Sequence, residues 1–287
     1  MISVCTIVAG RREHLANQAR GLAASEVIAD EWVVVGMNET PTVPDIAAGR
    51  AAQAVVTTRV DVEDRLPLAE ARNAAAEWAR GDVLVFLDVD CIPHPAMLSA
   101  FLQTLEQDDR LWMGDVRYLP RGAADGKWDF GSLQSVSVEH PLLPTLDGRP
   151  LPTDRYEGFW SLCFACTPQT WRQIGGFDTD YGGYGGEDTD FAFSARKAGV
   201  PFGHCPAMAF HQHHTVCKPP LNHFDSIVRN ARRFRKKWGL WPMESWLRQF
   251  AERGLLRYDE TSDDWQVLRS PNESEVAACR VDTPAGF

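Results

Sequence analysis

The sequence predicts an α/β fold: a mostly parallel central sheet flanked by helices, followed by a C-terminal helical extension. Strand and helix patterns alternate four times from the N-terminus, which is typical of βαβ units. The run 83–87 is apolar throughout, as expected of a central strand covered on both faces. The 287 residues are 44% hydrophobic and 24% charged, as in ordinary globular proteins.

The first part of the chain supplies the alternating elements. Residues 2–8 are β-branched and apolar, and Gly10 separates them from a helical pattern at 13–22. Further strands are expected at 31–35, 54–58 and 83–87, with an alanine-rich helix at 66–79. Ligands of such sheets bind beyond the carboxyl ends of the strands, so the residues after Leu87 are the first place to look for a site.

The rest of the chain has weaker signals. We expect a helix that starts at Pro93 and Pro95 and ends near residue 107, whereas 117–152 has few regular patterns. Later elements are expected as a strand at 160–166 and helices at 168–174, 187–198, 222–238 and 243–253. The last ~25 residues are polar and are expected at the periphery. We therefore expect a main region, 1–215, with halves 1–110 and 111–215, and an extension, 216–287.

The acidic balance excludes some classes of protein. With 29 Lys and Arg against 39 Asp and Glu, the net charge is −10, which argues against a general nucleic-acid binder. The longest apolar runs are far shorter than the ~20 residues that span a bilayer, and the first residues lack the pattern of a secretory signal. Seven cysteines without a regular framework favour a reducing compartment, so we expect a cytoplasmic protein.

Two carboxylates follow the apolar strand. Asp88 and Asp90 are two residues apart, so in an extended chain both side chains point to the same side. Paired oxygen ligands at this edge suit a divalent cation, Mn²⁺ or Mg²⁺, that holds phosphates of a substrate. The structural alternative is a helix or loop cap beside a solvated aspartate.

A glycine-rich segment, 175–190, ends in three acids. Its glycines allow close approach of the backbone to a ligand, or movement of a loop. Glu187, Asp188 and Asp190 then start a helix, where the helix dipole favours acids and one of them could serve as a plain cap. Three carboxylates in four positions repel one another, which should raise the pKa of at least one and suit it to act as a general base.

Histidines and basic residues gather in two later segments. His211, His213 and His214 suggest metal binding, and zinc bound with Cys163, Cys166, Cys205 and Cys217 is the rival interpretation. The run 229–237 carries six basic residues on a predicted helix. This helix is interpreted first as a solvated face, and otherwise as a contact for an anionic substrate, a membrane surface or nucleic acid.

Taken in order, these features resemble nucleotide-sugar glycosyltransferases of the GT-A fold, from family 2 and its relatives with a β-1,4-galactosyltransferase-type C-terminal segment. The resemblance covers about residues 2–215. It is carried by five motifs in this sequence: Arg11-x-Glu13-His14-Leu15, Ala71-Arg72-Asn73, Asp88-Val89-Asp90-Cys91-Ile92-Pro93, Gly185-Gly186-Glu187-Asp188-Thr189-Asp190 and Met208-x-x-His211.

The resemblance implies an inverting hexosyltransferase that uses a nucleotide sugar, with a UDP-sugar as the expected donor, and a glycan, glycoside or other hydroxyl acceptor. Asp188 corresponds to the catalytic base, and Glu187 to a residue that binds the donor or acceptor sugar. Asp90, His211 and Met208 correspond to metal ligands, with His213 or His214 as alternatives to His211. The implied nucleotide and donor contacts are Arg11, Arg72, Asp88, Tyr184 and Gly186, to which Asn38 is added as a candidate for recognition of the base. The region 1–110 would then bind the nucleotide, and 111–215 the acceptor.

The sequence departs from the family pattern at two places. Tyr184 stands where the family often has Trp, and Val35-Gly36-Met37-Asn38-Glu39 replaces the usual acidic motif after the second strand. Three alternatives stay open: a retaining glycosyltransferase, a nucleotidyltransferase that makes an activated sugar, and a non-catalytic zinc or nucleic-acid-binding module. The glycine-poor Ala9-Gly10-Arg11-Arg12 gives only a thin version of the phosphate loop that a nucleotidyltransferase needs.

Overall fold

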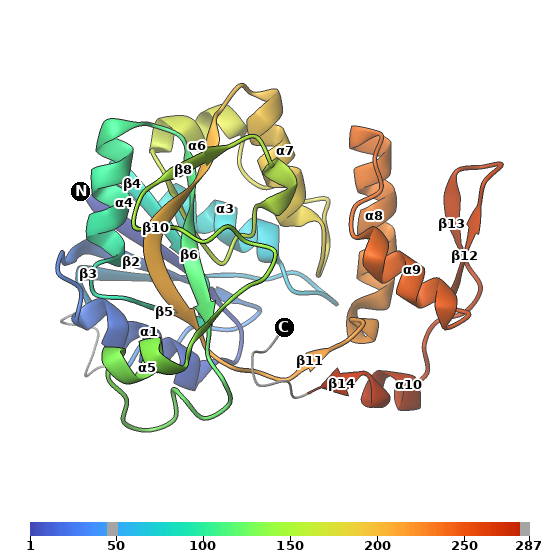
Figure 1. Ribbon diagram of the computed structural model, residues 1–287, viewed down its shortest axis with the longest axis horizontal. Helices are drawn as coiled ribbons and strands as arrows, with labels where there is room; N and C mark the ends of the chain where they lie inside the picture. The colour runs from blue at the N-terminus through green and yellow to red at the C-terminus, as the bar shows by residue number, and fades with distance from the viewer. Residues whose placement is uncertain (45–50, 282–287) are drawn as a thin grey trace.

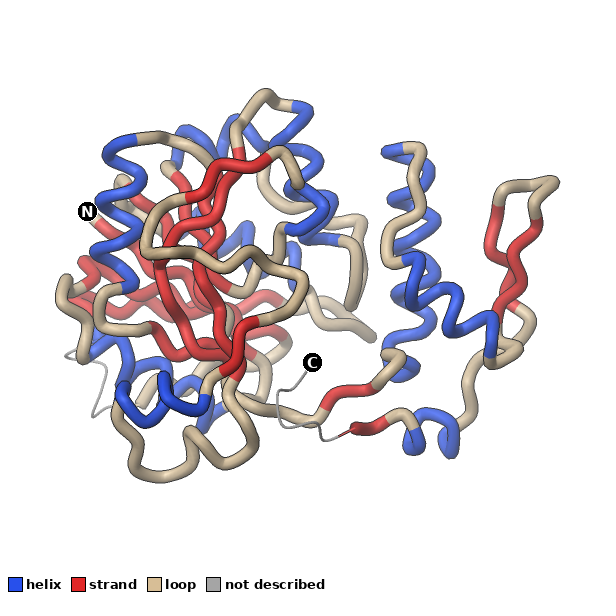
Figure 2. The backbone as a smooth tube through the Cα atoms, in the orientation of Figure 1, coloured by secondary structure: helices blue, strands red, loops and turns tan. Residues whose placement is uncertain are grey.

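The computed structural model describes residues 1–44 and 51–281. Its main body is an α/β sandwich, with one large sheet between two layers of helices (Figure 1). The sheet has ten strands in the order β3-β2-β1-β4-β9-β6-β10-β5, with β7 paired to β6 and β8 to β10. The tube in Figure 2 shows these strands at the centre of the body and a separate group of helices to one side. The predicted fold class is confirmed.

The parallel half of the sheet follows the expected alternation. Each strand in it pairs in parallel with its neighbours, β1 with both β2 and β4, and β2 with β3. The bounds are β1 Ile2–Val8, β2 Ala29–Met37, β3 Ala52–Val60 and β4 Val83–Leu87, with the helices α1 Arg12–Ala23 and α3 Leu68–Trp78. All four predicted strands and both helices are confirmed, and β2 and β3 extend at both ends.

The second half of the sheet is mixed. Strand β9, Cys163–Cys166, is antiparallel to both β4 and β6, Leu111–Tyr118. Strand β10, Phe202–His211, lies parallel to β6 and antiparallel to the short edge strand β5, Cys91–Pro93. The sequence did not predict β6 or β10. Strand β10 includes a glycine, a proline and two histidines, which hide its extended character, and its register with β6 shifts between His204 and Met208.

The helices complete two apolar layers. One core cluster lies between the sheet and α1 and α4, and a second lies on the other face with α3 and α7. The helices of the second half are α4 Met97–Gln107, α5 Phe130–Val136, α6 Pro168–Ile174 and α7 Glu187–Lys197. The segment expected to be irregular contains α5, β7 Val138–Glu139 and β8 Leu151–Thr153, elements too short to leave a periodic signal.

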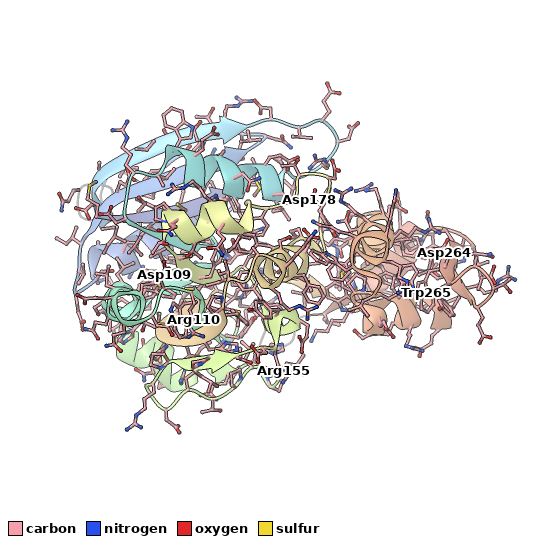
Figure 3. The ribbon with its side chains drawn as sticks, turned by 90° about the horizontal axis from the view of Figure 1, so that it is seen from above. Asp109, Arg110, Arg155, Asp178, Asp264 and Trp265 are labelled. Atoms are coloured by element: carbon pink, nitrogen blue, oxygen red, sulfur yellow. The ribbon has the colours of Figure 1, made fainter. Side chains whose placement is uncertain are left out.

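Residues 216–281, here called the C-terminal unit, pack around an apolar cluster of their own. Its elements are β11 Val216–Cys217, α8 Phe224–Trp238, α9 Glu244–Glu252, β12 Leu256–Asp259, β13 Asp264–Val267, α10 Glu273–Ala278 and β14 Arg280–Val281. The two predicted helices are confirmed, and the polar end of the chain adds a β-hairpin and α10. Figure 3 shows Asp178 of the main body at the boundary with this unit, and Asp264 and Trp265 within it.

Among the residues that the structure describes, none of the helices combines the length and the apolar character needed to cross a membrane.

Candidate active site

The candidate site lies where β4 and β10 end. Asp88 and Asp90 follow β4, while His211 is the last residue of β10 and His214 comes three residues later. Two buried amides hold these ends in place. The Gln18 side chain donates to the carbonyl of Asp88 at 2.8 Å, and the main-chain N–H of Gln212 donates to the carbonyl of Asp90 at 2.7 Å. The two strand ends therefore form one rigid edge.

Asp90, His211 and His214 form a potential metal site. Their ligand atoms all lie within 4.8 Å of one another. The Nδ1 atom of buried His211 finds no hydrogen-bond partner among the described residues, an arrangement that a metal ion would satisfy. One oxygen of Asp90 contacts His14 at 2.5 Å, and the other lies 3.7 Å from Nε2 of His214. One carboxylate with two imidazoles is a donor set that fits Mn²⁺ or a similar divalent cation.

The charge states of this group suit metal binding. Burial opposes ionisation of Asp90, but the hydrogen bond from His14 and the nearby Arg11 charge outweigh it and lower the pKa of Asp90 to about 2. Burial lowers the pKa of His211 to about 4. At neutral pH the carboxylate is therefore ionised and the imidazole is neutral, the forms in which both bind metals.

Two other predicted ligands lie elsewhere. His213 lines a cavity of about 410 Å³ between α1 and the 120–126 loop, beside the metal group. Met208 is three residues from His211 along β10, so the two side chains point to opposite faces, and Met208 packs against an apolar cluster that contains Phe210. The structure thus brings His214, and not Met208, to Asp90 and His211. Binding of the metal by Met208 stays a prediction.

A buried arginine connects the two acidic motifs. Arg72 of α3 donates to Asp88 at 3.3 Å, and its Nη1 atom lies 3.8 Å from a carboxylate oxygen of Glu187. That Nη1 has no hydrogen-bond partner among the described residues. Burial raises the pKa of Asp88 to about 6, although Arg72 opposes the shift. The arginine therefore lies between the strand end and the start of α7 and offers an unused donor there.

Glu187 and Asp188 occupy the first turn of α7. Burial, followed by repulsion from Asp188, raises the pKa of Glu187 to about 8, so Glu187 is mainly protonated at neutral pH. Burial also raises the pKa of Asp188, while Arg72 and hydrogen bonds that include the main chain of Ser161 oppose the shift. The predicted rise in pKa within the acidic triplet is confirmed for these two residues.

Asp190 does not belong to this acid group. It is 1% exposed and accepts hydrogen bonds from Tyr181 at 3.0 Å, Lys237 at 2.8 Å and Trp238 at 2.6 Å. Two of these donors are on α8, so Asp190 attaches α7 to the C-terminal unit. Asp190 lies two residues after Asp188 and points to another face of the helix, so its charge is used in the contact with α8.

Tyr184 and Gly186 lie on the loop that leads into α7. Gly186 has a φ of +86°, a left-handed conformation that favours glycine, and it caps the helix that carries the acid pair. The Tyr184 ring stacks on His223, with centroids 4.5 Å apart. Desolvation of the hydroxyl, followed by the influence of the acid pair, raises the pKa of Tyr184, although the residue as a whole is 40% exposed.

Arg11 and Asn38, the two residues predicted to contact the nucleotide, differ in whether their side chains are available to a ligand. Arg11 precedes α1 and lies 3.2 Å from Asp90, next to the metal group. Asn38 has a φ of +58°, and its amide donates to the carbonyl of Arg65 and accepts from the N–H of Val62, both at 2.8 Å. Its side chain therefore shapes the loop after β3, and a role in recognition of the base stays a prediction.

The sequence analysis did not give roles to three aromatic residues beside the site. Tyr118 at the end of β6 packs against His211, with centroids 4.9 Å apart, and next to Tyr118 lies His140. Trp160 then meets His140 edge to face at 4.5 Å. Together they form a wall that starts at the metal group. Only the unpredicted pairing of β6 with β10 brings Tyr118 to His211, so no local signal could have found it.

The structure also gives evidence on the cysteines and on the basic helix. Cys163 and Cys166 lie in separate core clusters on opposite faces of the sheet, so they cannot bind one zinc ion together. The basic run does not present a free cationic face, because four of its side chains form ion pairs within the chain. These pairs are Arg232 with Asp264, Arg233 with Asp178 and Asp180, Arg235 with Asp263, and Lys237 with Asp178 and Asp190.

Comparison with protein families gives two matches. The model of glycosyl transferase family 2 matches residues 19–137, and the model of the N-terminal domain of galactosyltransferase matches residues 150–215. The fold is of the GT-A type found in glycosyltransferases. The chain resembles glycosyl transferase family 2 in its first half and the N-terminal domain of galactosyltransferase in the segment that follows.

Comparison with solved structures supports the fold. S. aureus TarS 1-349 matches with a TM-score of 0.54 and 12% identity, over 82% of this chain and 65% of that one. GalNAc-T7, solved with UDP, GalNAc and Mn²⁺, matches with a TM-score of 0.54 and 16% identity, over 75% of this chain and 44% of that one. The present chain thus spans less than two thirds of either protein. A comparison with curated proteins gave no match.

Proposed function

We propose that this protein is a metal-dependent, inverting glycosyltransferase that moves a sugar from a nucleotide sugar, with a UDP-sugar as the expected donor, to an acceptor hydroxyl. One observation carries the proposal: Arg72 joins Asp88, beside a potential metal site, to Glu187, beside the candidate base Asp188. The galactosyltransferase-type match and the UDP and UDP-GlcNAc complexes of the TarS fold relatives favour UDP as the nucleotide.

The donor end would be formed by the strand edge. Asp90, His211 and His214 would hold a divalent cation, and Asp88 would contact the ribose or support the metal site. When bound, this cation stabilises the negative charge that grows on the departing diphosphate. Arg11 and the unused Nη1 of Arg72 are placed to donate to the same phosphates. In this assignment residues 1–110 bind the nucleotide.

The acceptor end would be formed by the first turn of α7. Asp188 takes the proton from the acceptor hydroxyl while the acceptor oxygen bonds to the anomeric carbon. The bond from that carbon to the phosphate oxygen breaks, so the configuration inverts. Protonated Glu187 donates a hydrogen bond to the donor or acceptor sugar. Residues 111–215 would bind the acceptor.

A titration of the protein with nucleotide sugars tests the proposal. UDP-galactose, UDP-glucose, UDP-N-acetylglucosamine and GDP-mannose would be titrated by calorimetry with and without Mn²⁺, followed by assays for hydrolysis and transfer. We expect one of the UDP-sugars to bind only with the metal, and NMR of the transfer product to show inverted configuration. Retained configuration would exclude the single displacement, and failure of every donor to bind would refute the proposed function. Release of pyrophosphate from a nucleoside triphosphate would favour the nucleotidyltransferase alternative.

A further inference from the structure

The loop that carries Tyr184 is attached to the C-terminal unit through its main chain. The side-chain amide of Asn230, a fully buried residue of α8, donates to the carbonyl of Gly185 at 2.9 Å and to that of Gly182 at 3.3 Å. Arg229 donates to the same Gly182 carbonyl at 2.7 Å. Because buried carbonyls need hydrogen-bond donors, these bonds help to fix the path of the loop.

The glycines pack closely against the C-terminal unit. A Cβ at Gly185 would lie 3.0 Å from the sulfur of Met243 and 3.2 Å from Ile227. A Cβ at Gly183 would lie 3.1 Å from Ser226. Both glycines have positive φ values, so a substitution would add backbone strain to these contacts. The glycines thus permit close contact with the C-terminal unit, a different use from the free loop movement that their number suggests.

The aromatic side chain of the loop is also held by this unit. Tyr184 is stacked on His223 at 4.5 Å, and the ring of Trp246 lies nearly parallel to it at 6.0 Å. His223 directly precedes α8, and Trp246 is on α9. The stack therefore holds the side chain of the residue that directly precedes the Gly185-Gly186 link to α7.

The loop is also attached directly to the first turn of α7. The N–H of Gly185 donates to the Glu187 carboxyl at 3.0 Å, and Gly186 is the N-cap of the helix. Three residues after the acid pair begins, Asp190 is bonded to Lys237 and Trp238 of α8. Glu187 and Asp188 are therefore held from both sides by contacts with one helix.

We propose that the C-terminal unit is part of the active site, and that Asn230 is a positioning residue that orients Asp188 and Tyr184 through the main chain of the glycine loop. The inference rests on the proposed function, because that function assigns Asp188 as the base. It adds that residues outside both family matches determine the rate of transfer without contacting the donor.

Kinetics of Asn230→Ala test this role. We expect kcat to fall by roughly tenfold to a hundredfold, because small displacements of a reacting group have effects of this size. The Kd of UDP in the presence of Mn²⁺ should stay within about twofold, because the donor end lies on other elements, and Asn230→Gln should recover part of kcat. Arg232→Ala is the matched control, since Arg232 lies on the same helix and pairs with Asp264. An unchanged kcat, or an equal loss of UDP affinity, would overturn the proposal.

A second pair of variants tests the same role if Asn230→Ala fails to fold. Trp246→Ala should lower kcat, whereas Trp241→Ala removes a tryptophan of the same unit that faces Asp263 and should leave kcat unchanged. Equal effects of the two changes would contradict the proposed role.

Hydrogen exchange separates this inference from the proposed function. In Trp246→Ala and Asn230→Ala, amides 183–188 should exchange at least about tenfold faster, while amides of β4 should not change. If the wild-type protein bound no nucleotide sugar but this pattern appeared, the function would fail and the attachment of the loop would stand. Unchanged exchange at 183–188 would refute the attachment itself.

Discussion

The two ends of the site place similar acidic side chains in opposite electrostatic surroundings. Asp90 lies among His14, Arg11 and two further histidines, and its pKa is lowered to about 2. Glu187 is buried beside another carboxylate with one distant arginine, and its pKa is raised to about 8. The comparison shows that burial alone does not set the charge of a carboxylate; the number of cationic and hydrogen-bonding neighbours decides it.

The largest effect should come from the acid end. Asp188→Asn removes the proposed base while it preserves shape, so kcat should fall by a factor on the order of 10³ or more. The affinity for UDP with Mn²⁺, measured by calorimetry, should stay nearly constant. Near wild-type turnover in this variant would show that another group accepts the proton.

At the metal end, His211→Ala should act mainly on the binding of UDP, whereas Asp188→Asn acts mainly on kcat. Removal of one ligand should weaken Mn²⁺-dependent binding of UDP by about a hundredfold, judged from the size of ligand effects in metal sites. His213→Ala is the control, because His213 lines the neighbouring cavity and lies outside the metal group. If both variants bound UDP equally well, the assignment of His211 would be wrong.

A third carboxylate, Asp190, tests the rule that the neighbours of a buried carboxylate decide its charge. Lys237→Ala leaves this buried group without its cation, which should lower the free energy of unfolding by about 1–3 kcal/mol. Lys236→Ala, next to it on the exposed side of α8, should change the free energy by less than about 0.5 kcal/mol. Urea unfolding measures both values, and equal changes would contradict the structural role of the pair.

The smallest effect should be a change in the pH dependence of stability. Because the pKa of Glu187 is about 8 in the folded protein against 4.5 for a free glutamate, the folded state keeps a proton that the unfolded state loses between these values. Wild-type stability should therefore decrease as pH rises through this window. In Glu187→Gln the decrease should be smaller, so the variant gains relative to wild type by about 1 kcal/mol or more between pH 5 and 8.

Unfolding at several pH values checks this, with Glu77→Gln as the control for the loss of an exposed carboxylate on α3. A constant difference between Glu187→Gln and wild type across the range would show that Glu187 is ionised in the folded protein.

Local sequence patterns predicted the features that depend only on residues adjacent in the chain. The apolar run of β4, its Asp88 and Asp90, and the acid pair after the glycines could all be found without a structure. His214 was among the histidines that the sequence singled out, but only the fold shows that it joins His211 at Asp90. The position of Arg72 between Asp88 and Glu187 and the contact of His14 with Asp90 depend on strand order, which brings together residues far apart in the chain. The C-terminal helices were predicted, but their contact with the glycine loop was not, because the basic residues on α8 gave no sign of their internal acidic partners.

The attachment of Asp190 has a consequence for attempts to shorten or recombine this protein. The galactosyltransferase-type match ends at residue 215, which makes that position an obvious place to cut the chain. A chain cut there would keep the carboxylate of Asp190 but lose Lys237 and Trp238, and it would expose the apolar face of α7 around Phe193. A transplant of residues 111–215 into another scaffold should therefore include α8.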